Sequence, residues 1–377
     1  MYNVIIIGLG SMGSSALYQL AKRGVMVLGL EQFGIGHAKG SHSGQSRIVR
    51  KAYFEHPDYV PLLEKAYKGW DSIQQESGKQ LFHKNGLVYF GKPEHEVMEG
   101  VKRSAGEFGL NIEQKTGNIE HRMFTVPDDF EVLWEPEAGF ALTEPTIRTF
   151  VEQAEKHGAE VQTRETVMGW RLKDSYVEVH TDKMEYHTEK LILTAGAYTN
   201  QLIPGLSDQL KVTRQLIFWL KPQHPEQFKP ERFPCWVIAE PDYPGIFYGF
   251  PILSTEQGGD GLLKVAHHAP GESIHPKDLS EFNPEKEKEK LSSFLKKYMP
   301  EVSVEIVKVT ACLYTYSEDE HFIIDFLPET NSNVVLAAGF SGHGFKFVPV
   351  VGKILADLAL EGYTKHPIDF LRLDRFL

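Results

Sequence analysis

Two arginines, Arg47 and Arg50, flank Ile48-Val49 just after a segment over residues 34–44 that is rich in glycine, histidine and serine. In an extended segment, residues three apart point to opposite faces. A guanidinium is costly to bury unless it meets an anion or an aromatic ring. The pair therefore predicts two binding contacts on opposite sides of one strand. The alternative is a pair of arginines that both lie in solvent.

A single lysine, Lys264, interrupts the apolar run Leu262–Ala266. An unpaired charge is rare inside such a run, which favours a functional lysine. The alternative is that its aliphatic stem lies along the sheet while the ammonium group reaches solvent. Residues four apart share one face of a strand, so we expect His268 beside Lys264 and His267 on the opposite face.

The chain contains two cysteines, Cys235 and Cys312, which lie far apart in the sequence. This usage fits a reducing cytoplasm and argues against a disulfide scaffold. Taken alone, Cys312 is typical of a small buried hydrophobic residue, and we interpret Cys235 as structural. No spacing of cysteine, histidine and carboxylate residues predicts a metal site.

The first 31 residues predict a complete βαβ unit for binding a dinucleotide. The apolar run Val4–Ile7 predicts a buried parallel strand, and an amphipathic helix and a second strand over residues 25–30 follow the turn. The turn is a GxGxxG whose glycines allow a tight bend, close approach of a pyrophosphate, and helix packing. Glu31 ends the second strand, where it can accept hydrogen bonds from a ribose. The alternative is a glycine-rich turn in an ordinary α/β sheet. The three glycines are Gly8, Gly10 and Gly13.

Two later segments rich in small residues predict further contacts with the same ligand. One is the strand end that contains Ala195 and Gly196, and the other is the glycine-dense segment 338–347, more than 300 residues after the first turn. A nicotinamide-binding domain does not need a second ligand contact so far along the chain. A flavin does, because its ring extends well beyond the pyrophosphate. A helix N-terminus there can stabilise the negative charge of a reduced flavin. The alternative is a simple helix cap.

The pattern of predicted elements indicates two interleaved domains of an α/β protein. Both ends of the chain alternate strands and helices, whereas residues 211–316 are rich in long strands. We predict a Rossmann-like FAD-binding domain from residues 1–85, 142–210 and 318–377. An α+β substrate domain, mainly an antiparallel sheet, is predicted from residues 86–141 and 211–317. Helices are expected over residues 58–75, 94–108, 144–157 and 345–360, with another beginning at residues 283–284.

Composition narrows the range of partners and compartments. The 377 residues carry a formal net charge of −11 and show no long basic block, so we expect neither nucleic acid nor anionic membrane as a partner. No apolar run approaches the roughly 18 residues of a membrane span. The first strand begins at once, so we expect no signal peptide and a cytoplasmic protein.

Six motifs give the chain a resemblance to a known family over essentially its whole length. On them it resembles the monomeric sarcosine oxidase and N-methyltryptophan oxidase family of covalent flavoprotein amine oxidases. The motifs are GLGSMG from Gly8 with Glu31, GSHSGQSRIVRKAY from Gly40, FYGFP from Phe247, LLKVAHH from Leu262, ACLYTYSEDEHFIID from Ala311 and AAGFSGHGFKF from Ala337.

The resemblance implies a monomeric FAD-dependent oxidase whose partners are a small amino acid substrate and oxygen. It would convert a secondary, N-methyl-type amino acid to an amine, an aldehyde and hydrogen peroxide. A pipecolate, amadori-type or other amine oxidase would share every motif. A flavin dehydrogenase with a different electron acceptor and a flavin-binding protein without activity also remain open.

The resemblance also implies roles for individual residues. Cys312 would hold FAD through a thioether, and Arg47 would lie against one flavin face. Arg50 and Lys346 would bind the substrate carboxylate, Lys264 would assist oxygen reduction, and His268 would lie near the substrate amine. Tyr314 and Tyr248 would line the site. The residues implied at FAD are Gly8, Gly10, Gly13, Glu31, Ser41, Ser46, Arg47, Val167, Ala195, Gly196, Cys312, Gly342, His343, Gly344 and Lys346.

The chain departs from the family pattern in the lid over residues 53–57. This segment carries Phe54 and a proline, Pro57, where the best-known members have Gly-Glu-Gly. A bulkier and stiffer lid changes which side chain fits, so the reaction class follows from the resemblance while the substrate stays open.

Overall fold

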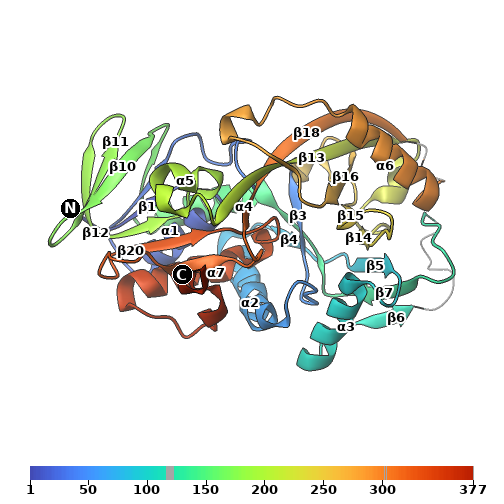
Figure 1. Ribbon diagram of the computed structural model, residues 1–377, viewed down its shortest axis with the longest axis horizontal. Coiled ribbons are helices and arrows are strands. Elements are labelled where there is room, and N and C mark those ends of the chain that lie inside the picture. Colours follow the sequence, from blue (N-terminus) through green and yellow to red (C-terminus); the bar gives the residue numbers. More distant parts are fainter. Residues whose placement is uncertain (116–122, 301, 303, 377) are drawn as a thin grey trace.

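The computed structural model describes residues 1–115, 123–300, 302 and 304–376. Two large sheets lie at opposite ends of the molecule, and two long strands, β13 (Leu210–Pro222) and β18 (Val304–Ser317), extend between them (Figure 1). The predicted fold class is confirmed, because one sheet is Rossmann-like and parallel and the other is largely antiparallel. Within these residues, no helix is long and apolar enough to cross a bilayer.

The first sheet has a parallel core and an antiparallel extension. Strand β12 belongs to both, because its second half pairs with β1 and β20 while its first half pairs with β11. The parallel order is β9 (Glu160–Thr163), β2 (Val27–Glu31), β1 (Tyr2–Ile7), β12 (Glu185–Leu193) and β20 (Val334–Ala338). The antiparallel strands are β10 (Val167–Leu172) and β11 (Val177–Thr181) beside β12, and β19 (Ile323–Phe326) beside β20.

Side chains of β1 alternate between two hydrophobic cores, as strand geometry requires. Val4 and Ile6 pack with the helices, whereas Ile5 and Ile7 pack against β10–β12 and the C-terminal segment. Helix α1 contacts both α4 and α7, and α7 contacts α2. These helices are α1 (Ser11–Lys22), α2 (Val60–Ser77), α4 (Thr143–Lys156) and α7 (Val348–Glu361).

The second sheet is antiparallel except where β14 pairs with β5. Phe294 of α6 (Glu285–Tyr298) lies flat on Phe247, with ring centroids 3.9 Å apart, so this helix covers one face. The other strands are β5 (Leu87–Gly91), β6 (Glu113–Lys115), β7 (Glu131–Glu135), β14 (Cys235–Ile238), β15 (Ile246–Gly249), β16 (Leu263–His268) and β17 (Glu272–Ser273).

A small third sheet carries the arginine pair, with β3 (Ser46–Val49) on β8 (Gly139–Leu142) and β8 on β4 (Phe82–His83). The remaining helices are α3 (Glu96–Phe108) and the short α5 (Thr199–Leu202).

Several element boundaries differ from those predicted. The second strand begins at Val27, because the backbone N–H of Val25 still donates to Leu20 at the end of α1. The last helix starts with a 3-10 turn over Phe345–Phe347, and α7 proper begins beside Pro349, which has no N–H to donate.

Candidate active site

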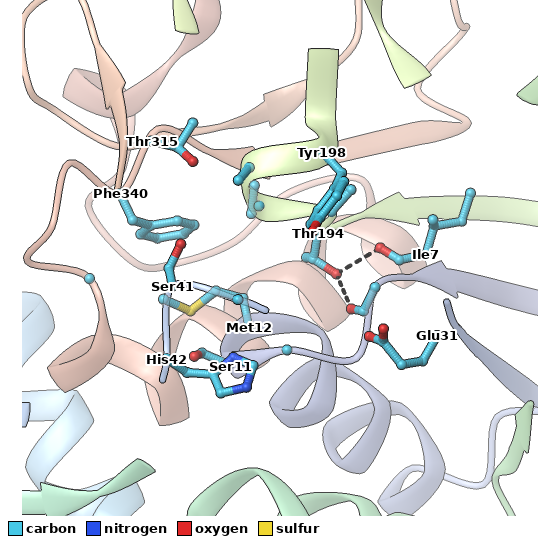
Figure 2. A pocket seen from close by; sticks show the side chains of 18 of the residues that line it. Ile7, Ser11, Met12, Glu31, Ser41, His42, Thr194, Tyr198, Thr315 and Phe340 are labelled. Atoms are coloured by element: carbon cyan, nitrogen blue, oxygen red, sulfur yellow. Dashed lines mark hydrogen bonds between the residues drawn. The ribbon is translucent and has the colours of Figure 1, made fainter. Parts of the chain in front are cut away.

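A long cavity of about 1270 Å³ begins at the first βαβ unit and reaches the glycine-dense segment 339–345 (Figure 2). Most of the residues predicted to hold FAD line it. They are Gly8, Gly10, Glu31, Ser41, Arg47, Val167, Ala195, Gly196, Gly342 and Gly344.

The first turn has room for glycine alone at Gly8 and Gly13. Gly8 has φ +92°, and a Cβ there would lie 2.7 Å from the carbonyl oxygen of Thr194. A Cβ on Gly13 would lie 1.9 Å from the carbonyl oxygen of Gly8, so Gly13 supports the turn from behind without lining the cavity. The hydroxyl of Thr194 donates to the carbonyls of Ile7 (3.1 Å) and Gly8 (2.8 Å), which joins β12 to the turn (Figure 2).

Glu31 is buried at one end of this cavity as an ionised carboxylate. Its oxygens accept hydrogen bonds from the backbone N–H groups of Leu9 (3.0 Å) and Phe33 (2.9 Å), and Nε2 of His37 lies 3.5 Å away. Burial alone would raise the pKa of Glu31, but the hydrogen bonds from His37 and the backbone lower it. An anion with free acceptor capacity therefore faces the cavity, as ribose binding requires.

Further along the cavity, the hydroxyl of Thr315 is buried and has no hydrogen-bond partner among the described residues. A buried hydroxyl without a hydrogen-bond partner destabilises the folded state unless a bound ligand supplies that partner. Gly342 has φ +82°, and a Cβ there would lie 2.2 Å from the ring of Tyr314. An elongated ligand with polar groups along its length, as FAD has, fits these features.

A second cavity of about 540 Å³ adjoins the first. The two share the lining residues Arg47, Tyr314, Gly342 and Phe345. The rest of the second cavity combines cationic and polar groups with an apolar wall. It is lined by Ile48, Arg50, Phe54, Glu55, Val237, Ile246, Tyr248, His268, His343 and Lys346.

Arg47 is held at the junction of the two cavities by backbone carbonyls. Its guanidinium donates to the carbonyls of Ser46 (2.8 Å), Ser41 (2.7 Å) and Ser43 (2.7 Å). Three neutral acceptors fix the group without cancelling its charge. Arg47 therefore presents a positive charge where the cavities meet.

Arg50, in contrast, already has an anionic partner. Its Nη2 lies 2.6 Å from each carboxylate oxygen of Glu55, and its Nη1 donates to the carbonyl of Ala52 (2.7 Å). The Phe54 ring lies over the guanidinium at 3.9 Å. Although burial opposes ionisation of Glu55, the charge of Arg50 lowers the pKa of that carboxyl to about 2. Sequence reasoning missed Glu55 as a site residue, although a carboxylate five residues after a buried arginine was an available signal.

Lys346 and His343, both from the glycine-dense segment 338–347, line the second cavity. The ammonium group of Lys346 donates to the carbonyl of His343 at 2.7 Å. Burial, reinforced by the charge of Arg50, lowers the pKa of Lys346 to about 7. Burial also lowers the pKa of His343 to about 3, and its Nδ1 is hydrogen-bonded to the hydroxyl of Tyr53. Both residues were predicted to contact FAD, but they line the second cavity and not the first.

The two histidines of β16 lie on opposite faces of the sheet. Nδ1 of His268 is 3.4 Å from the hydroxyl of Tyr314 in the second cavity. The ring of His267 stacks on Phe247 at 4.3 Å, and its Nε2 lies 2.8 Å from the carbonyl of Pro244. Burial lowers the pKa of His268 to about 4, so this imidazole is neutral near pH 7.

Lys264 is buried behind the arginine strand. Its ammonium group donates to the carbonyl of Ser46 and lies 4.3 Å from the ring centroid of Phe250. Burial, with a smaller contribution from the Arg47 charge, lowers the pKa of Lys264 well below its usual range. Gly44, whose Cβ position is 3.8 Å from this ammonium group, lines a third cavity.

Ser46 and Cys312, also predicted at FAD, lie outside the lining of the first cavity. Cys312 is buried on β18, two residues before Tyr314 and therefore on the same face of the strand. Burial raises the pKa of its thiol, an effect that the charges of Arg47 and Lys264 oppose.

Comparison with known proteins agrees with this geometry. The family model for FAD-dependent oxidoreductases matches residues 3–358. Monomeric sarcosine oxidase from Streptomyces avermitilis is 36% identical over 97% of this chain and 96% of its own length. N-methyl-L-tryptophan oxidase from Yersinia pestis is 31% identical over 100% of this chain and 99% of its own.

Solved structures give the same picture of the fold. The open form of NikD, an amino acid oxidase essential for nikkomycin biosynthesis, has a TM-score of 0.86 at 26% identity, covering 98% of this chain and 97% of that one. L-proline dehydrogenase from P. horikoshii has a TM-score of 0.85 at 21% identity, covering 100% and 97%, which shows the fold alone. The chain therefore belongs to the FAD-dependent oxidoreductases, within the group of amino acid and amine oxidases that includes monomeric sarcosine oxidase and N-methyl-L-tryptophan oxidase.

Proposed function

We propose that the protein oxidises a secondary, N-methyl-type amino acid with dioxygen and water, giving the primary amine, an aldehyde and hydrogen peroxide. The observation that supports this most is the pair of adjoining cavities that meet at Arg47 and Tyr314. One fits FAD, and the other is small, partly apolar and equipped with cations for a carboxylate. When bound, FAD supplies the acceptor for the hydride equivalent that leaves the N–CH carbon.

The carboxylate of the substrate is assigned to Arg50 and Lys346. Both cations lie in the second cavity, and Glu55 already occupies Arg50 with two hydrogen bonds. An incoming carboxylate has the same shape and charge as that of Glu55. Binding at Arg50 therefore requires the substrate to displace Glu55, while Lys346 offers a second contact without competition.

The amine of the substrate is assigned to the side of the cavity that carries His268 and Tyr314. A neutral His268 does not repel an amine and can exchange a hydrogen bond with it, and its low pKa makes it a poor proton acceptor at neutral pH. Catalysis then depends on positioning the N–CH bond against the first cavity, with no protein base required.

Oxygen reduction is assigned to the Lys264 side. The first electron transfer to oxygen creates an anion, and a cation nearby stabilises it. Lys264 is buried close to Arg47, where the first two cavities meet, and a Cβ on Gly44, which lines the third cavity, would lie 3.8 Å from its ammonium group. We also assign a covalent attachment of FAD to Cys312, because its side chain shares a strand face with Tyr314.

The stoichiometry of the reaction tests this proposal. With sarcosine as substrate, the proposal predicts one formaldehyde and one hydrogen peroxide for each dioxygen consumed. An oxygen electrode combined with peroxide and formaldehyde assays measures all three. Formaldehyde formed only when an artificial electron acceptor is added would identify a dehydrogenase and contradict the proposal.

A further inference from the structure

Four side chains of the kind that bind metal ions lie on one face of the hairpin formed by β11 and β12. Glu178 and His180 are two apart on β11, and Glu185 and His187 are two apart on β12. The register pairs Glu178 with His187 and His180 with Glu185. Cross-strand partners have Cβ atoms about 4.5–5.5 Å apart and point to the same side. The hairpin therefore presents two histidines and two glutamates in a two-by-two array.

Three members of this array, Glu178, His180 and Glu185, have ligand atoms close enough to share one ion. Nε2 of His180 lies 2.5 Å from Oε1 of Glu178, and its Nδ1 lies 3.4 Å from Oε2 of Glu185. Nε2 of His187 lies 2.8 Å from the other oxygen of Glu185. One ligand atom each from Glu178, His180 and Glu185 fall within 4.8 Å of one another. A tetrahedral ion with bonds of about 2.0–2.2 Å holds its ligand atoms roughly 3.3–3.6 Å apart, so small rotations of these side chains would bring them to an ion.

The array contains a buried imidazole nitrogen without a hydrogen bond to any described residue, and it carries an excess of negative charge. The Nε2 atom of His180 is buried, and its contact with Oε1 of Glu178 does not have hydrogen-bond geometry. Glu178 is only 8% exposed, an unusual environment for a carboxylate on the outer part of a sheet. Lys173 is the one cation that contacts it within the described part of the chain, at 3.5 Å. With neutral imidazoles, the two carboxylates and this lysine leave one net negative charge, which favours a dication.

We propose that Glu178, His180 and Glu185 bind one divalent transition-metal ion, which joins β11 to β12, and that His187 turns from Glu185 to become its fourth ligand. Imidazole nitrogen combined with carboxylate oxygen suits Zn²⁺, Ni²⁺ or Cu²⁺, whereas Ca²⁺ and Mg²⁺ require a larger set of oxygen ligands. The sequence pattern E-x-H-x₄-E-x-H was not predictive by itself, because its four members meet only after the hairpin pairs them. The site lies apart from the residues that line the second cavity, so it does not depend on the proposed reaction.

Calorimetric titration of the untagged, FAD-loaded protein with Zn²⁺ at pH 7.5 tests the site. We expect one ion per chain, and an affinity at least about tenfold weaker in both His180→Asn and Glu178→Gln, because the loss of even an outer-shell partner costs that much. His224→Asn removes an exposed histidine elsewhere and is expected to bind as the unchanged protein does. Several weak ions per chain, or equal affinity in His180→Asn, would overturn the proposal.

Two further measurements separate coordination from a change in folding. With one equivalent of Cu²⁺, electron paramagnetic resonance is expected to show coupling to two nitrogens, falling to one in His187→Asn. Zn²⁺ is expected to raise the Tm of the unchanged protein by mass action and to leave that of His180→Asn unchanged. A copper spectrum without two coupled nitrogens would overturn the assignment, even if circular dichroism shows that every variant is folded.

Discussion

At the scale of single residues, the contact between Arg50 and Glu55 determines how a carboxylate enters the site. Arg50→Met and Lys346→Met each remove one cation from the second cavity. A charge-assisted hydrogen bond contributes about 1.5–3 kcal/mol, so either change is expected to weaken binding of methylthioacetate roughly tenfold to a hundredfold. Flavin absorbance titration measures this affinity.

Two variants make the same experiment more specific. Glu55→Gln keeps the shape of the side chain but removes the competing anion, so we expect tighter binding of the same inhibitor. Lys51→Met removes a neighbouring cation that pairs with Glu137 at the surface, and it is expected to have no effect. Unchanged affinity in both Arg50→Met and Lys346→Met would place the anion site elsewhere.

The pKa of Lys346 gives inhibitor binding a defined pH dependence. Its pKa of about 7 means that the ammonium form predominates below pH 7 and the neutral amine above it. Because only the charged form attracts a carboxylate, affinity is expected to fall as pH rises through about 7. The same titration at several pH values measures this slope. In Lys346→Met the slope should disappear, and a slope that persists there would assign the titration to another group.

Cys312 is expected to carry FAD covalently. Acid precipitation of the unchanged protein should give a yellow pellet, whereas Cys312→Ser should release the flavin into the supernatant. Cys235→Ser is the matched control, because Cys235 is equally buried but lies on a different strand, β14, and not on β18 beside Tyr314. A white pellet under a yellow supernatant for the unchanged protein would contradict the covalent link.

At the scale of elements, β16 carries one residue for each half-reaction: Lys264 is assigned to the oxygen step and His268 to the substrate step. Lys264→Met is expected to slow reoxidation of the reduced flavin by air roughly 10²–10³-fold, because one preorganised charged contact contributes about 2.7–4 kcal/mol. Reduction by substrate should stay near the unchanged rate. Stopped-flow absorbance measures each step.

The control is Lys221→Met, which removes an exposed lysine on β13 that lines none of the three cavities. Since burial lowers the pKa of Lys264, reoxidation in the unchanged protein should also slow as pH rises and the ammonium group loses its proton. Reoxidation of Lys264→Met at the unchanged rate would remove this lysine from the oxygen step.

Elements whose pattern is local were predictable from the sequence, and elements that depend on distant partners were not. The first βαβ unit follows from an apolar run, three glycines and a terminal acid within 31 residues. Strand β14 has only four residues, and besides the next strand, β15, it pairs with β5, almost 150 positions earlier.

The same distinction applies to the candidate site. The cations Arg47, Lys264 and Lys346 were visible as charges in apolar or glycine-rich surroundings. The ion pair between Arg50 and Glu55 was not predictable, because sequence spacing does not determine how the lid over residues 53–57 packs against Arg50. The orphaned hydroxyl of Thr315 was also hidden, since burial is a property of the assembled cavity.

At the scale of the whole molecule, we propose that the chain divides into an FAD-binding unit (residues 1–85, 142–210 and 318–377) and a substrate unit (86–141 and 211–317). Strand β13 begins at Leu210 and strand β18 ends at Ser317, where the chain passes from one unit to the other. Each strand extends from one large sheet toward the other (Figure 1). The two adjoining cavities meet at Arg47 of the first unit and Tyr314 of the second. The function therefore depends on both units together.

The measurement that tests the central claim most directly is anaerobic reduction of the bound flavin by a panel of amines. The panel contains sarcosine, N-methyltryptophan, pipecolate, proline and fructosyl-glycine. The account predicts rapid bleaching by at least one of the two N-methyl amino acids, faster than by the other three, and return of the colour with hydrogen peroxide when air is admitted. Bleaching by none of the five, or only by pipecolate, proline or fructosyl-glycine, would contradict it.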